Sequence, residues 1–119
     1  MGTIRIGIAG GAGYTGGELL RILINHPHAE ICWIHSNSNA GKPISDVHAD
    51  LFGDTDLKFT DSISQDIDVL FLCVGHGDAK KFLDSHEIEG GIKIIDLSQD
   101  FRLSPNATHG SRSFVYGLP

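Results

Sequence analysis

Glycine is concentrated in one short segment of this 119-residue sequence, and its spacing is the strongest chemical signal in the chain. The segment can be written as Gly11-x-Gly13-x-x-Gly16 or as Gly10-x-x-Gly13-x-x-Gly16. Either pattern leaves a backbone that can touch a pyrophosphate group, just before a segment of helical periodicity. The amino end of a helix adds free N–H groups and a partial positive charge, which stabilise a phosphate. The segment therefore predicts a dinucleotide-binding turn, against the alternative of a tight turn without a ligand.

Polar residues without a carboxylate stand where NAD-selective enzymes carry an acid. In those enzymes an Asp or Glu about 20 residues beyond the glycines binds the ribose 2′-hydroxyl. Here residues 35–38 read His-Ser-Asn-Ser, and Lys42 follows shortly after. We expect Ser36, Ser38 and Lys42 to suit the 2′-phosphate of NADP better than the free hydroxyl of NAD. The alternative is a solvated Ser/Asn loop.

A histidine between two glycines marks a third candidate segment. His76 could act as a general base. The flanking Gly75 and Gly77 favour instead a loop whose backbone passes close to the cofactor. We expect these three residues, with Tyr14 and Thr15 at the first turn, to contact the cofactor.

The last polar segment contains Ser98 and Arg102. We expect Ser98 to contact the cofactor. The planar guanidinium of Arg102 could hold an anionic group of the substrate with two hydrogen bonds. The alternative for Arg102 is an ion pair with Asp100 or Asp96.

Strands and helices must alternate to position these segments. An apolar period of two, or a short apolar run, predicts a strand, whereas a period of 3.6 predicts a helix. The patterns predict strands at residues 3–9, 30–35, 57–60, 69–74 and 92–97, and helices at 16–25 and 78–86. This alternation is typical of the α/β class, here a Rossmann-type open, mostly parallel sheet with helices on both faces. Ligands of such sheets bind beyond the carboxyl ends of the strands, where the polar segments described above begin.

The same patterns give expectations for individual elements. On the first helix Leu19, Ile22 and Leu23 share one face and should pack inward. Asp78 should cap the second helix. The last two predicted strands are apolar enough to be buried on both faces. The long connection after the second strand should hold a short helix or an ordered loop.

Composition argues against several classes of function. The net charge of −6 and the lack of a basic run argue against nucleic acid as a partner. The longest apolar run is far shorter than the roughly 20 residues that span a bilayer, so we expect no membrane segment and a cytoplasmic location. Cys32 and Cys73 lie in predicted strands, where a thiol packs as a small hydrophobe. His26 and His28 have no cysteine or carboxylate at ligand spacing, so we expect no metal site.

Together these segments resemble the N-acetyl-gamma-glutamyl-phosphate reductases, a family within the semialdehyde dehydrogenase superfamily. The resemblance runs nearly end to end and depends on residues 13–20 (GYTGGELL), 26–27 (HP), 36–42 (SNSNAGK), 76–77 (HG), 96–103 (DLSQDFRL) and 116–119 (YGLP). The sequence departs from the family at Gly11, where alanine is frequent, and at Gly75, where proline is common. Neither departure affects the expected cofactor binding.

The resemblance implies a reductase of arginine biosynthesis that uses NADPH to convert N-acetyl-gamma-glutamyl phosphate, a small acyl phosphate, to the semialdehyde and phosphate. In that family a cysteine of an Asn-Pro-Gly-Cys motif attacks the acyl phosphate, assisted by a histidine. The motif is absent from this sequence, so we expect no catalytic residue in it and no activity from it alone. We expect residues 1–119 to form the NADP-binding domain of a longer, homo-oligomeric enzyme. The nucleophile, its histidine and the substrate domain would lie beyond Pro119.

Two alternatives stay open at this point. One is an enzyme similar to aspartate-semialdehyde dehydrogenase, which shares the glycine loop and the acyl-phosphate chemistry. The other is a stand-alone domain that senses NADP and catalyses nothing.

Overall fold

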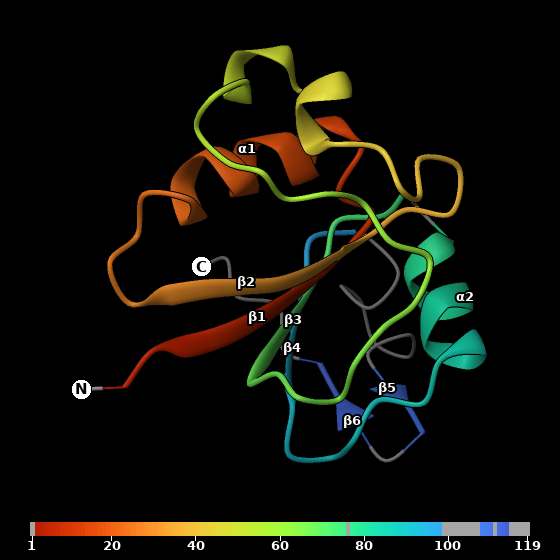
Figure 1. The fold of residues 1–119 in the computed structure, drawn as a ribbon. Helices are drawn as coiled ribbons and strands as arrows, with labels where there is room; N and C mark the ends of the chain where they lie inside the picture. The colour runs from red at the N-terminus through yellow and green to blue at the C-terminus, as the bar shows by residue number, and fades with distance from the viewer. Residues whose placement is uncertain (1, 76, 99–107, 111, 115–119) are drawn as a thin grey trace, which may run out of the picture.

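A four-stranded parallel sheet forms the centre of the computed structural model, which describes residues 2–75, 77–98, 108–110 and 112–114 (Figure 1). Its strands are β1 (Ile4–Ala9), β2 (Ala29–His35), β3 (Val69–Leu72) and β4 (Lys93–Asp96), in the order β2-β1-β3-β4. The helices are α1 (Tyr14–Leu23) and α2 (Asp78–Ser85). Two short 3₁₀ turns, η1 (Ile44–Asp46) and η2 (Ala49–Leu51), precede β3, and an antiparallel pair, β5 (Thr108–His109) and β6 (Arg112–Ser113), follows β4. The predicted Rossmann-type α/β fold is confirmed.

The strand order puts the glycine turn where the winding of the sheet reverses. β1 is central, with β2 paired on one side and β3 on the other. Such a switch point, beyond the carboxyl ends of the strands, is where open α/β sheets bind ligands. Main-chain hydrogen bonds join these ends: Gly10 and Gly11 donate to the carbonyl of His35 at 3.1 and 3.3 Å, and Cys73 donates to the carbonyl of Ala9 at 2.8 Å. The three loops that leave β1, β2 and β3 therefore start side by side.

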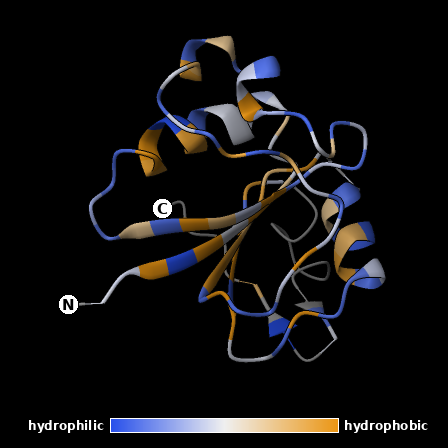
Figure 2. Cartoon of the chain, in the orientation of Figure 1, coloured by the Kyte–Doolittle hydropathy of each residue, from blue (hydrophilic) through white to orange (hydrophobic). Residues whose placement is uncertain are grey.

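Two hydrophobic clusters cover the two faces of the sheet. One contains Leu20 and Leu23 of α1, and the other contains Ala79, Phe82 and Leu83 of α2. Figure 1 shows α1 and α2 on opposite sides of the strands, and Figure 2 shows both helices mixing hydrophobic and hydrophilic residues. Each helix thus buries one face and exposes the other, as the 3.6-residue period requires.

A bulge in β2 adjusts the sheet beneath the glycine turn. Cys32 is an extra residue there, because the pairing with β1 shifts between Ile6 and Gly7. The shift turns Trp33 into the cluster on the α2 side. A Cβ at Gly7 would lie 2.4 Å from the Trp33 ring, so the glycine in the middle of β1 makes room for the indole.

The predicted strand at residues 57–60 is wrong. This segment makes only isolated bridges, with Lys58 opposite Pro43 and Thr60 opposite His35. Its pairing partners lie in two different segments, so no continuous ladder forms. The long connection before it contains η1 and η2, in agreement with the expectation of a short helix or ordered loop.

Three predictions on helix and strand detail are also wrong. Ile22 of α1 is 65% exposed, because the buried side of that helix consists of Gly16, Gly17, Leu20 and Leu23. Asp78 does not cap α2 but is its first helical residue, and Gly77, with a φ of +83°, is the cap. β4 lies at the edge of the described sheet and exposes 43% of Ile95, so it is not buried on both faces.

No helix in the described part of the chain is both long enough and apolar enough to cross a membrane.

Candidate functional site

Close contacts on several sides hold the glycine turn after β1. Gly10 has a φ of +80°, and a Cβ there would lie 2.7 Å from Cγ1 of Val74. At Gly11 a Cβ would lie 2.1 Å from Cγ2 of the buried Ile34, and at Gly16 it would lie 2.7 Å from the Cα of Gly11. With these neighbours, the packing in this chain leaves no room for a side chain at the three positions.

Gly13 differs from the other glycines of the turn. A Cβ there would meet no described atom closer than the carbonyl oxygen of Gly10 at 3.9 Å, and its φ of −83° suits any residue. Packing therefore does not explain the glycine at this position, which leaves the backbone open to solvent. An open cradle of this kind fits the pyrophosphate of a dinucleotide.

The start of α1 supplies the matching electrostatics. Gly13 is the N-cap residue, and among the described residues no side chain caps this helix and no acid stands in its first turn. The helix therefore presents uncapped N–H groups and partial positive charge at the turn. Tyr14 and Thr15, which were expected to contact the cofactor, are exposed at this end, Tyr14 by 84%.

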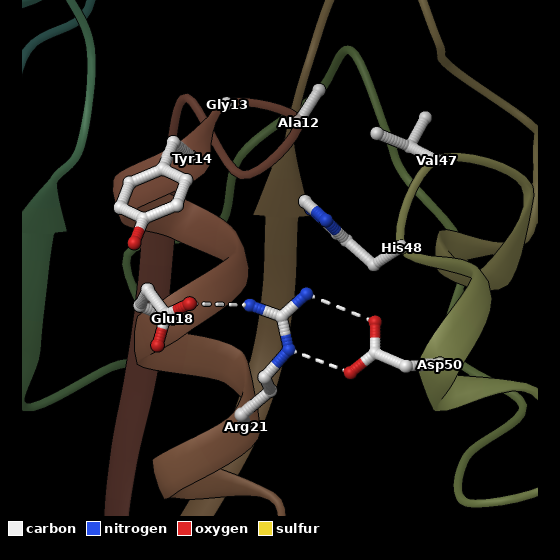
Figure 3. A pocket seen from close by; sticks show the side chains of 8 residues that line it. All are labelled: Ala12, Gly13, Tyr14, Glu18, Arg21, Val47, His48 and Asp50. Atoms are coloured by element: carbon white, nitrogen blue, oxygen red, sulfur yellow. Dashed lines mark hydrogen bonds and ion pairs between the residues drawn. The ribbon is translucent and has the colours of Figure 1, made fainter.

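A shallow pocket of about 430 Å³ lies between α1 and the η1–η2 segment, beside the glycine turn (Figure 3). Its lining residues are Ala12, Gly13, Tyr14, Glu18, Arg21, Val47, His48 and Asp50. Arg21 donates to both carboxylate oxygens of Asp50, at 2.6 and 2.9 Å, and to Glu18 at 2.8 Å. The hydrogen bonds between Arg21 and Asp50 raise the pKa of the guanidinium and lower that of the carboxyl. This bidentate pair joins α1 to η2.

Sequence reasoning missed His48, which is 7% exposed and lies between η1 and η2. Its Nε2 lies 2.7 Å from the carbonyl oxygen of Gly11. The only available signal was the unusual length of the segment between β2 and β3, because nothing in the spacing of His48 connects it with the glycines.

The loop after β2 has an anchored backbone and exposed side chains. Gly41, with a φ of +86°, donates to the carbonyl of Phe59 at 2.8 Å, and the amide of Phe59 donates to the carbonyl of Lys42 at 2.9 Å. The side chains of Lys42 and Ser38 are exposed, which leaves both available to a ligand. Ser36 is buried, and its hydroxyl accepts a hydrogen bond from the Asn39 amide at 3.2 Å.

The other predicted site residues follow β3 and β4. Gly75 and Gly77 are exposed and come just before α2, with Gly77 as the N-cap of that helix. Ser98 is 2% exposed, and its amide donates to a carboxylate oxygen of Asp96 at 2.9 Å. His76 and Arg102 lie outside the described residues.

His35 joins the glycine turn to the loop after β2. Its carbonyl accepts both turn amides described above, while its ring packs edge-on against Phe82 and His86 of the α2 segment at 5.3 Å. Its Nε2 has no hydrogen-bond partner among the described atoms. Burial, and to a smaller extent His86, lowers the pKa of His35, so the ring is neutral near pH 7.

Comparison with known proteins gives a consistent assignment. Residues 5–119 match the family described as semialdehyde dehydrogenase, NAD binding domain. Proteins named N-acetyl-gamma-glutamyl-phosphate reductase are similar over 98% of this chain: 56% identical in Bacteroides thetaiotaomicron, 58% in Bacteroides fragilis and 48% in Christiangramia forsetii. The chain spans only 35% of the length of these relatives.

A solved structure agrees on the fold. The crystal structure of aspartate semialdehyde dehydrogenase with NADP from Candida albicans matches with a TM-score of 0.66 over 83% of this chain and 30% of that one, at 18% identity. The family resemblance drawn from the sequence is confirmed by the family match and by the similar reductases. This chain belongs to the NAD-binding domain family of the semialdehyde dehydrogenases.

Proposed function

We propose that this chain is the cofactor-binding part of an NADPH-dependent reductase that converts N-acetyl-gamma-glutamyl phosphate to N-acetylglutamate semialdehyde and phosphate. Support comes from the identity of 48–58% to proteins named for this reaction. The single structural observation that carries cofactor binding is the open backbone at Gly13, at the uncapped start of α1. The acetylglutamyl enzyme is favoured over an aspartate-semialdehyde dehydrogenase, because identity to the solved structure of the latter is only 18%.

The proposed roles follow from the placement of the groups. The Gly13 backbone and the start of α1 hold the pyrophosphate, and the loop 75–77 passes beside it. Ser38 and Lys42 bind the 2′-phosphate, because both are exposed polar residues of an anchored loop and Lys42 carries a positive charge. When bound, NADPH would supply the hydride for the reduction.

The rest of the proposal concerns the longer enzyme. Arg102 would hold an anionic group of the substrate, and the nucleophilic cysteine, its histidine and the substrate domain would lie outside residues 1–119. A homo-oligomer and a cytoplasmic location belong to the same proposal.

The test replaces Gly13 with alanine and titrates the chain with NADPH by calorimetry. The new methyl group has room in the folded protein, so the unfolding midpoint should stay within experimental error of wild type. It would also block the pyrophosphate, so we expect the affinity for NADPH to fall at least tenfold. Gly90→Ala is the matched control, because a Cβ there meets nothing within 4 Å and lies away from the turn. Equal NADPH affinity for Gly13→Ala and wild type would contradict the proposed pyrophosphate site.

A further inference from the structure

Main-chain hydrogen bonds hold His48 in position between η1 and η2. Its amide donates to the carbonyl of Ile44 at 2.9 Å, and its carbonyl accepts from the amide of Leu51 at 2.9 Å. Ile44 and Leu51 are both buried in the cluster beneath α1. The η1–η2 segment is therefore a fixed support that carries the imidazole toward the glycine turn, as Figure 3 shows.

The proton of the imidazole can be assigned from its partner. A carbonyl oxygen only accepts hydrogen bonds, so the 2.7 Å contact requires a proton on Nε2 of His48. The donor fixes the direction of the Gly11 carbonyl. Because a peptide bond is planar and trans, the N–H of the same peptide, that of Ala12, must point away from His48.

Gly17 gives an independent sign that this contact matters. A Cβ at Gly17 would lie 2.7 Å from both Cε1 and Nδ1 of His48. Gly17 is inside α1, where alanine would favour the helix more than glycine does. Glycine at this position therefore makes room for the imidazole, and pyrophosphate binding does not explain it.

We propose that His48 is a positioning residue, which orients the Gly11–Ala12 peptide so that its N–H faces the diphosphate of the bound dinucleotide and its carbonyl does not. A misoriented carbonyl would direct partial negative charge toward the phosphates. The proposal depends on the proposed function, because it requires that a diphosphate binds at the glycine turn. His48 itself need not touch the cofactor.

The experiment titrates the chain and its variants with NADPH and, separately, with adenosine 2′-monophosphate, which lacks the diphosphate. His48→Phe keeps a ring but loses the donor, whereas His48→Gln keeps an N–H donor at a similar reach. We expect His48→Phe to weaken NADPH binding at least tenfold and His48→Gln to stay within threefold of wild type. Binding of adenosine 2′-monophosphate should be unchanged in both variants. The exposed His28, replaced with phenylalanine, is the matched control.

A second variant keeps the test decisive if His48→Phe does not fold. Gly17→Ala leaves His48 in the sequence but displaces its ring, so it should also weaken NADPH binding and spare adenosine 2′-monophosphate. NADPH affinity unchanged in both His48→Phe and Gly17→Ala would overturn the proposal. Equal weakening for both ligands, or a loss in His48→Gln as large as in His48→Phe, would overturn it too. If the wild-type chain binds no NADPH, the proposed function fails first, which is a distinguishable result.

Discussion

The turn after β1 and the loop after β2 both leave the same edge of the sheet, yet they are built in different ways. In the turn, neighbouring atoms leave no room for side chains at Gly10, Gly11 and Gly16. In the loop, main-chain hydrogen bonds anchor the backbone, while the side chains of Ser38 and Lys42 are exposed to solvent. The turn would bind through main-chain groups, whereas the loop would bind through side chains.

This difference separates two properties of the proposed cofactor site. Pyrophosphate binding would depend on the shape of the turn backbone, which close packing at Gly10, Gly11 and Gly16 maintains. Selection between NADP and NAD depends on exposed side chains, which can change at little cost in stability. Substitutions at the packed glycines of the turn should therefore lower stability, whereas substitutions at Gly13 or in the loop should affect affinity alone.

The largest effect on stability is expected for Gly11→Ala. Its Cβ would lie 2.1 Å from Cγ2 of Ile34, which is fully buried and has little space to move. Overpacking of this kind costs about 1–3 kcal/mol in the free energy of unfolding, occasionally more. Urea denaturation followed by circular dichroism would measure it, with Gly13→Ala as the comparison. Equal denaturation midpoints for the two variants would show that packing does not distinguish these glycines.

A smaller effect, on affinity only, is expected for Lys42→Glu. The reversed charge would repel a 2′-phosphate, so the affinity for NADPH should fall about tenfold, or about 1.4 kcal/mol. NADH has no such phosphate and should bind within twofold of wild type, as measured by titration. Lys93→Glu, at the amino end of β4, serves as the charge-matched control. A parallel loss for NADH, or an effect as large in the control, would argue against Lys42 as the selectivity residue.

His35, which joins the glycine turn to the loop after β2, should make the stability of the fold depend on pH. The pKa of His35 is lowered from its ordinary value near 6.5, because burial and His86 disfavour the charged ring. The unfolded chain therefore binds the proton more readily, and stability should fall as the pH drops through and below about 6.5. Denaturant titrations at several values between pH 5 and 7.5 would measure the slope.

His35→Phe tests which group is responsible for that slope. The variant keeps a ring beside Phe82 and His86 but has no group that can take up a proton at this position. Its stability should depend less steeply on pH than that of wild type. A slope identical to wild type would assign the pH dependence to other groups.

The smallest effect is expected for the reactivity of Cys73, whose thiol is buried just after β3. Burial, with a minor contribution from Asp96, raises the pKa of Cys73 to about 12. Cys32 is only partly buried, and its pKa is also raised, mainly by burial. With iodoacetamide at pH 8, Cys73 should stay unmodified in the folded chain and react in urea, as mass spectrometry would show. Faster alkylation of Cys73 than of Cys32 would mean that the turn above it opens in solution.

Much of the architecture could be predicted because it depends on local patterns. The period of two in β1 and the glycines after it require a strand followed by a sharp turn. The buried face of α1, which contains Leu20 and Leu23, was not predicted correctly. Ile22 fits a helical pattern equally well, and only the packing of the helix decides which side is buried. The strand predicted at residues 57–60 was wrong for a similar reason, because the pairing of a strand depends on its partner as well as on its own residues.

The sequence by itself determined the fold class, the position of the glycine turn and the absence of an acid after β2. These features follow from residue types over a few neighbouring positions. Only the tertiary structure decided which glycines serve packing and which one faces open space, and only it brought His48 to the carbonyl of Gly11. The physical reason is that these contacts join segments far apart in the chain, and their distances depend on how α1 and the η1–η2 segment pack together.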